Sequence, residues 1–235
     1  MKGNLQRATE RLQDGTTSKG AGGPWIVVIV LVFLVGVVVG VATKLLLAAN
    51  RAPDDDSAEV GFARDMAIHH AQAVEMAEIV RDRTESEEMQ TLASDIALTQ
   101  QGQIGQMEGW LAVWGLPATR TGPAMAWMEH STEGRMPGMA SPKEVEELLE
   151  APPEEMDVRF LQLMIPHHEA AIPMAEAALE RSDRPEVERL AGAIAASQEA
   201  EIQAMQDLLR SRGVWVEETS PTPDESPHGG HEHGD

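Results

Sequence analysis

The strongest constraint on the fold of this chain is an internal duplication. Residues 62–115 align with residues 160–213 without a gap when the sequence is shifted by 98 positions, and about a third of the aligned pairs are identical. Two copies are too few for a solenoid, which needs at least three repeats. The duplication therefore predicts two equivalent units that pack against each other.

The spacing of apolar residues predicts that each unit is a helical hairpin. In the first helix of each copy the seam positions step by four and three residues, as they do on the inner face of a bundle helix. These positions are Phe62, Met66, His69, Ala73, Met76 and Val80, and then Phe160, Met164, His167, Ala171, Met174 and Ala178. Breaks follow at residues 83–86 and 181–185, and we expect Ser182 or Asp183 to cap the last helix.

Each returning helix carries a second apolar stripe. The stripes are Leu92, Ile96, Ile104, Met107 and Leu111, and then Leu190, Ile194, Ile202, Met205 and Leu209. Gly115 and Gly213 are placed as C-terminal caps. Because one amphipathic hairpin cannot bury its stripes alone, we predict an all-α fold, a four-helix bundle over residues 57–213 of the ferritin-like type.

The segments outside the hairpins have their own compositions. Residues 116–141 form a connection rich in Pro, Gly and Met, and Ser141 to Glu144 is a capping box that predicts a short helix to Glu150. Residues 50–56 read as a linker. Residues 214–235 are polar, rich in Pro and Gly, and lack apolar periodicity, so we expect a disordered acidic tail.

An apolar segment near the N-terminus predicts a membrane helix over residues 24–49. Residues 25–43 contain no charge, and at about 1.5 Å per residue they nearly span a hydrocarbon core of roughly 30 Å. A cleavable signal peptide is the alternative, but its apolar region would be shorter, and Leu47 spoils a cleavage site before Asn50. We expect an uncleaved anchor.

Residues 1–23 carry four Lys or Arg and two acidic residues. The positive-inside rule therefore places them in the cytoplasm, and we expect a single-pass protein of the cell membrane with its C-terminal domain extracytoplasmic.

The part of the chain after the membrane helix has a net charge of −24. So acidic a chain is a poor partner for nucleic acid, and cations are favoured instead. The absence of Cys excludes disulfides and thiolate metal sites.

The two His-His pairs carry the predicted chemistry. His69 and His167 occupy seam positions, and His70 and His168 lie on the flank of the same seam. Antiparallel pairing within each hairpin brings Gln100 level with His69 and Gln198 level with His167. Buried imidazoles and amides cost free energy unless they are hydrogen-bonded, so this His/Gln layer predicts either mutual satisfaction or a ligand.

Methionines next to the histidines favour copper as that ligand. Met66 and Met76 lie one or two turns from the first His pair, and Met164 and Met174 repeat them. Imidazole binds copper, zinc, iron and nickel, whereas a thioether selects chiefly Cu(I). The predicted ligands are thus the four histidines and these four methionines, with zinc or another divalent metal as the alternative. Auxiliary positions are Gln100, Gln198, Met107, Met205, Glu78 and Glu176.

The same residues also allow a core-packing interpretation and other kinds of metal site. Each Met is also an ordinary filler of an irregular core, and each His is also a satisfied core histidine. A carboxylate-bridged di-iron site is disfavoured, because no Glu stands three residues before any of the four histidines. Common hydrolase motifs and a phosphate-binding Gly loop are missing. We therefore do not expect an enzyme.

Three motifs resemble a known bacterial family. The segments MIPHHEAAIPMAE at 164–176, MAIHHAQAVEMAE at 66–78 and MPGM at 136–139 resemble those of the family called domain of unknown function 305. The resemblance implies an exported or membrane-anchored protein with a ferritin-like fold, and copper handling as in the copper-binding metallochaperones of the family. It covers roughly residues 57–213. The first copy departs from the second in having Ala67 and Ile68 where Ile165 and Pro166 stand, so unequal sites are expected.

The sequence leaves three hypotheses. The first is a membrane-anchored, extracytoplasmic copper-binding protein for sequestration or for hand-over to a protein partner. The second is a structural or sensory envelope module whose His/Gln layer is only a polar core feature. The third is an enzyme with a His-bound metal.

Two further segments are candidate metal-binding segments: the connection with Met125, Met128, His130, Met136 and Met139, and the tail with His228, His231 and His233.

Overall fold

The computed structural model describes residues 24–49, 51–120, 122–128, 132 and 134–214. Within these residues the chain is all-helical, with six α-helices, one short 3-10 turn and a single isolated bridge between Ala124 and Thr132. The predicted fold class is confirmed. The predictions for residues 1–23, for His130 and for the tail histidines lie outside the described residues.

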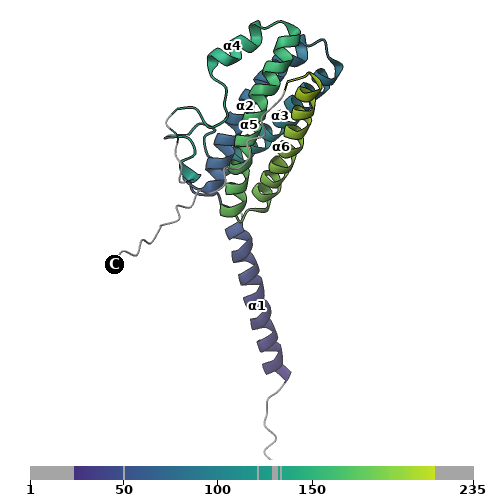
Figure 1. Ribbon diagram of the computed structural model, residues 1–235. Coiled ribbons are helices and arrows are strands. Elements are labelled where there is room, and N and C mark those ends of the chain that lie inside the picture. Colours follow the sequence, from purple (N-terminus) through teal and green to yellow (C-terminus); the bar gives the residue numbers. More distant parts are fainter. Residues whose placement is uncertain (1–23, 50, 121, 129–131, 133, 215–235) are drawn as a thin grey trace, which may run out of the picture. The chain divides into compact units, whose positions relative to one another are not determined.

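The chain divides into two compact units, residues 1–51 and residues 52–235. The first unit contains α1, Pro24–Ala49 (Figure 1). Residues 25–44 have a mean hydropathy of 3.2 and none of them is buried. This helix is therefore long and apolar enough to cross a membrane, and an N-terminal signal sequence meets the same criteria.

The second unit holds two long helical hairpins. Helix α2, Ala58–Arg83, returns through α3, Glu87–Trp114, and helix α5, Pro153–Arg181, returns through α6, Pro185–Ser211 (Figure 1). The hairpins join chiefly through α2 and α5, which pack against each other. The first helix of each sequence copy thus lies at the centre of the bundle, where its seam side chains meet those of its duplicate.

Helix ends follow local sequence. Gly115 adopts a left-handed φ of 72° as the C-cap of α3, as predicted. The C-cap of α6 is Arg212, and Gly213, which was predicted as the cap, follows it with a φ of 75°. The capping box at Ser141 and Glu144 begins α4, Pro142–Glu150. One expectation is wrong: the N-cap of α6 is Arg184, not Ser182 or Asp183. The Ser182 hydroxyl instead accepts a hydrogen bond from the Arg184 N–H within the turn that precedes α6.

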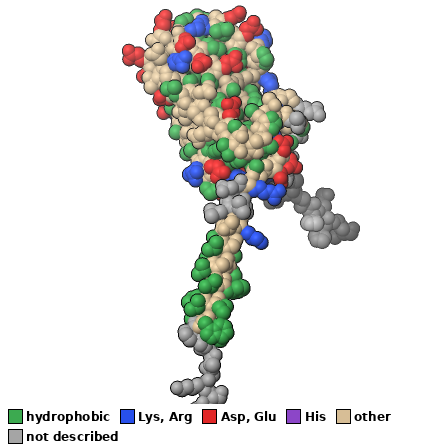
Figure 2. All heavy atoms as spheres, turned by 180° about the vertical axis from the view of Figure 1, so that it is seen from behind, with side chains coloured by type: hydrophobic (Ala, Val, Ile, Leu, Met, Phe, Trp, Pro, Cys, Tyr) green, Lys and Arg blue, Asp and Glu red, His purple; other side chains and the backbone are tan. Residues whose placement is uncertain are grey.

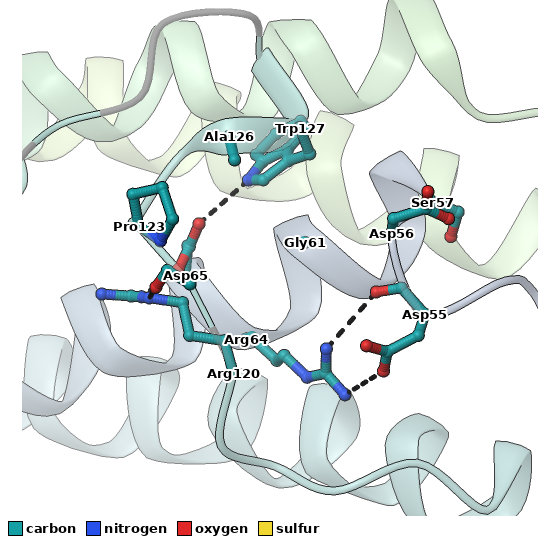
Figure 3. A pocket seen from close by; sticks show the side chains of 11 residues that line it. Asp55, Asp56, Ser57, Gly61, Arg64, Asp65, Arg120, Pro123, Ala126 and Trp127 are labelled. Carbon is teal, nitrogen blue, oxygen red and sulfur yellow. Dashed lines mark hydrogen bonds and ion pairs between the residues drawn. The ribbon is translucent and has the colours of Figure 1, made fainter.

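The connection between the hairpins is anchored on α2 through Asp65. This carboxylate is buried, and it accepts hydrogen bonds from the Met125 N–H at 2.8 Å and the Trp127 indole N–H at 3.0 Å and pairs with Arg120 (Figure 3). Beside it, a cavity of about 350 Å³ lies between the start of α2 and the connection. Because three groups of the connection converge on one carboxylate, the connection is attached to α2 at Arg120, Met125 and Trp127.

The Trp127 ring lies over a glycine of α2. A Cβ added at Gly61 would come within 2.3 Å of Trp127 ring carbons. The nearest atoms include Trp127 Cβ, which cannot move without moving the connection. Glycine at position 61 is therefore required by this close approach.

We predict that Gly61→Ala destabilises the protein by about 1–3 kcal/mol, the usual cost of overpacking. The matched control is Gly109→Ala on α3, where an added Cβ meets nothing within 4 Å. There the better helix propensity of Ala should raise stability by up to about 1 kcal/mol. Thermal unfolding of the two variants, followed by circular dichroism, measures both effects. Equal midpoints would contradict the proposed packing of Trp127.

Candidate metal centre

Four histidine rings meet in the interior of the bundle. His69 and His70 come from the middle of α2, His167 and His168 come from the middle of α5, and each is at most 1% exposed. The ring centroids of His69 and His167 are 3.8 Å apart, and those of His167 and His168 are 6.2 Å apart. The duplication thus brings equivalent residues of the two copies into direct contact.

Buried amides accompany these rings. Gln100 and Gln198 are each 1% exposed on the returning helices, and Gln103 is 7% exposed on α3. The apolar core divides into two clusters that do not include these residues. One cluster contains Met66, Met107 and Met174, and the other contains Met76, Met164 and Met205. We call the four histidines with Gln100 and Gln198 the polar layer.

Most nitrogen atoms of the polar layer lack a hydrogen-bond partner in the described part of the chain. Six of the eight imidazole nitrogens are unpartnered: Nδ1 of His69 and His168, and both ring nitrogens of His70 and His167. Both side-chain polar atoms of Gln100 and the Oε1 of Gln198 are unpartnered as well. Because buried polar groups in native proteins are nearly always satisfied, this concentration of free donors and acceptors fits a ligand such as a metal ion.

Two of the histidines have partners that define their tautomers. The Nε2 of His69 lies 3.1 Å from the Pro137 carbonyl oxygen, and the Nε2 of His168 lies 2.7 Å from Glu201 Oε2. A carbonyl and an ionised carboxylate only accept, so in both rings Nε2–H donates. The Nδ1 of each ring is then left with a free lone pair. Metal-binding histidines usually have such an acceptor on the opposite ring nitrogen.

The segment Met136 to Ala140 lies against the polar layer from the side of the connection. The Gln72 side chain donates to the Ala140 carbonyl at 2.9 Å and accepts from the Ala140 N–H at 2.7 Å. Gly138 adopts a φ of +74°, and a Cβ there would come 2.4 Å from the Pro166 carbonyl oxygen and 2.9 Å from His167 Cα. This close approach explains the glycine of the MPGM motif.

Burial favours the neutral form of three of the imidazoles. Desolvation lowers the pKa of His69 from 6.5 to about 4, although the Pro137 carbonyl opposes it, and nearby His168 lowers it further. Desolvation lowers the pKa of His70 to about 3, with further lowering by His69 and His168. The pKa of His167 is well below 6.5, again chiefly through burial and then through the other three rings. Neutral imidazole is the form that binds metal, and these three rings are in that form at neutral pH.

The other predicted ligands have different positions. Met66, Met76, Met164 and Met174 are fully buried in the two apolar clusters, and so are the auxiliary Met107 and Met205. Glu78 and Glu176 are exposed, and Glu78 lies 3.9 Å from Arg81, so they do not belong to the polar layer. Among the described residues no three His, Asp or Glu side chains surround a common point as a metal ion requires. Methionine sulfur atoms are not among the ligands considered in that statement.

Sequence reasoning missed three groups at the site: the Pro137 carbonyl, Gln103 and Glu201. The first is a backbone atom of a connection without periodicity, and no side-chain pattern marks it. Gln103 and Glu201 occupy equivalent positions of the two copies, because they are 98 positions apart. This equivalence was the sequence signal that could have identified them. In the connection, Met125, Met128 and Met136 are buried in the same apolar cluster as Met66 and Met174, and a role of these methionines in metal collection stays a prediction.

The comparisons with known proteins agree with this architecture. The family model for the domain of unknown function 305 (DUF305) matches residues 59–209. The chain belongs to the DUF305 family. A DUF305 protein of Streptomyces coelicolor with a crystal structure is 47% identical, with a TM-score of 0.66 over 68% of this chain and 97% of that one. A DUF305 fragment from Deinococcus radiodurans is 38% identical, with a TM-score of 0.57 over 68% of this chain and 99% of the fragment.

A third similar structure is CopM, solved in Cu(I)-bound and Cu(II)-bound forms. The Cu(I) form is 27% identical with a TM-score of 0.50, over 66% of this chain and 96% of that one. The Cu(II) form is 28% identical with a TM-score of 0.52, over 66% and 97%. The comparison with curated proteins gave no match. These findings confirm the predicted family and its helical fold.

We predict that the metal-free protein loses stability as the pH falls from 6.5 toward 4. In the unfolded chain these histidines take up protons below pH 6.5, whereas the folded protein keeps them neutral. The unfolded state therefore binds more protons in this window, and protonation favours unfolding. His69 and His70 should each contribute about 2 kcal/mol of destabilisation between pH 7 and pH 5.

Urea unfolding of the full-length chain in detergent, at pH 7 and pH 5, measures this dependence. The control is His70→Leu, which removes one titrating ring and should flatten the dependence by about one histidine's share. A variant with the same pH dependence as the wild type would contradict the assignment of His70.

Proposed function

We propose that this protein binds copper in the polar layer between its two hairpins and retains or hands over the metal without catalytic turnover. The observation that carries the proposal is the set of six unpartnered nitrogens on four buried imidazoles. In this proposal the copper is cargo. His69, His70, His167 and His168 supply the imidazole ligands, and the low pKa values of three of them leave those rings neutral at physiological pH.

The methionines favour Cu(I) over other oxidation states and metals. Met66, Met76, Met164 and Met174 are fully buried on the same two helices as the four histidines, so thioether sulfur is present in the core around them. Cu(I) accepts thioether ligands, whereas zinc prefers imidazole, thiolate and carboxylate. The absence of a His/Asp/Glu triad among the described residues is compatible with a site of imidazole and thioether ligands. The Cu(I)-bound and Cu(II)-bound forms of the similar protein CopM support copper as the metal, in either oxidation state.

In this proposal α1 is an uncleaved anchor and the helical unit is extracytoplasmic. The uncharged span of residues 25–43 and the basic residues before it support that orientation. On the face drawn in Figure 2, acidic side chains lie at many places on the helical unit and no histidine is visible. A negative surface around a buried neutral site attracts cations and leaves their selection to the interior ligands. Such a surface also offers a docking face to a protein partner for hand-over.

We predict that the full-length protein in detergent retains Cu(I) against a competing chelator and that His69→Ala/His167→Ala binds it at least about 100-fold more weakly, a loss of roughly 2.7 kcal/mol. The double variant removes the two rings that contact each other across the bundle. Ile68→Ala is the control, because Ile68 is adjacent to His69 but 40% exposed.

Native mass spectrometry and chelator competition report stoichiometry and affinity. Retention of neither copper nor zinc by the wild type would contradict the proposal and favour a structural or sensory module. Full retention by a folded double variant would place the metal elsewhere.

We also predict that Met66→Leu/Met164→Leu weakens Cu(I) binding by about tenfold but leaves zinc uptake unchanged. Leu conserves the volume of Met, so the fold should be retained at a cost below about 1.5 kcal/mol per site. Met89→Leu is the matched control, since Met89 is equally buried but has no predicted ligand role. Equal Cu(I) affinities for both variants would show that sulfur takes no part in binding.

A further inference from the structure

The duplicate histidines His70 and His168 differ at one buried contact. Glu201 on α6 lies 2.7 Å from the Nε2 of His168, with its side chain 19% exposed. The duplicate position in the first copy is Gln103, which lies near His70 and slightly raises its pKa. Neither ring nitrogen of His70, however, has a hydrogen bond of normal geometry. Identical histidines of the two copies thus have different partners.

A carboxylate and an amide act differently on an imidazole. An ionised carboxylate only accepts, so it holds the proton on Nε2 and keeps the lone pair on Nδ1. An amide both donates and accepts, and it therefore stabilises either tautomer. A carboxylate partner also makes the ring a stronger donor to metal, and loss of such a partner usually costs 10–100-fold in metal affinity. A negative charge next to the layer further compensates the charge of an entering cation.

We infer that Glu201 is a positioning residue that fixes His168 as its Nε2–H tautomer and makes the histidine pair of the second copy the point where the polar layer first takes up metal. Gln103 leaves His70 without that fixed orientation. The site is then asymmetric despite its origin in a duplication. This inference rests on the proposed copper binding for its second half, while the tautomer of His168 is a property of the metal-free protein.

A reciprocal exchange between the duplicate positions tests the inference. Glu201→Gln gives the second copy the partner of the first, and Gln103→Glu gives the first copy the partner of the second. Both changes are nearly isosteric. Glu199→Gln, two residues before Glu201 and exposed, is the control for loss of one negative charge on α6. Each protein is prepared as the full-length chain in detergent, and its thermal midpoint is recorded.

The first measurement is the ¹⁵N NMR spectrum of the histidine side chains without metal at neutral pH. We expect His168 as a single Nε2–H tautomer in the wild type and in Glu199→Gln, and as a mixture in Glu201→Gln. We expect His70 to change from a mixture to a single tautomer in Gln103→Glu. An unchanged His168 spectrum in folded Glu201→Gln would overturn the inference whether or not the protein binds copper.

The second measurement is Cu(I) titration with the same spectra and a competing chelator. In the wild type, the His168 Nδ1 signal should shift during the first equivalent, before the His70 signals. Glu201→Gln should bind about 10–100-fold more weakly. Simultaneous shifts of His70 and His168, or an unchanged affinity in Glu201→Gln, would overturn the order of uptake. A wild type that takes up no copper would refute the proposed function and the order of uptake, while the tautomer spectra would still decide the role of Glu201.

Discussion

The structure depends on the burial of four imidazoles in the interior of the helical bundle. Desolvation penalises the charged forms of His69, His70 and His167, and it lowers the pKa of His69 to about 4 and that of His70 to about 3. Six unpartnered ring nitrogens are an unfavourable arrangement for a core whose purpose is stability alone. An apolar side chain at any of these positions would avoid that cost. The layer therefore costs folding free energy, and the proposed copper binding would give that cost a function.

The neighbouring structure gives this layer a fixed shape. Asp65 holds the connection on α2 through three partners, and Gln72 holds Ala140 by a pair of hydrogen bonds. Between these anchors the Pro137 carbonyl reaches His69, and Gly138 approaches α5 too closely for a side chain. The segment Met136 to Ala140 thus forms one wall of the polar layer. A rigid wall of this kind holds neighbouring side chains in a fixed geometry.

The duplication and its periodicity made the fold predictable from sequence. They place the helices, the breaks, the glycine caps and the burial of His69, His70, His167 and His168, because apolar spacing in a repeat determines which residues face inward. The contacts of the connection were not predictable, since Pro137 contributes only a backbone atom and Gly138 depends on tertiary packing. The contact between His168 and Glu201 also escaped, because pairing by turn length is uncertain by about one helical turn. Exposed Glu78 and Glu176 were identical in both copies but do not reach the layer.

The contact between His69 and His167 joins residues that are 98 positions apart. Neither hairpin alone assembles the four rings, so a nascent chain whose second hairpin is still unsynthesised carries only half of the donors. Closing so long a segment is entropically costly and is completed late in folding. The complete polar layer therefore arises only with the finished tertiary structure.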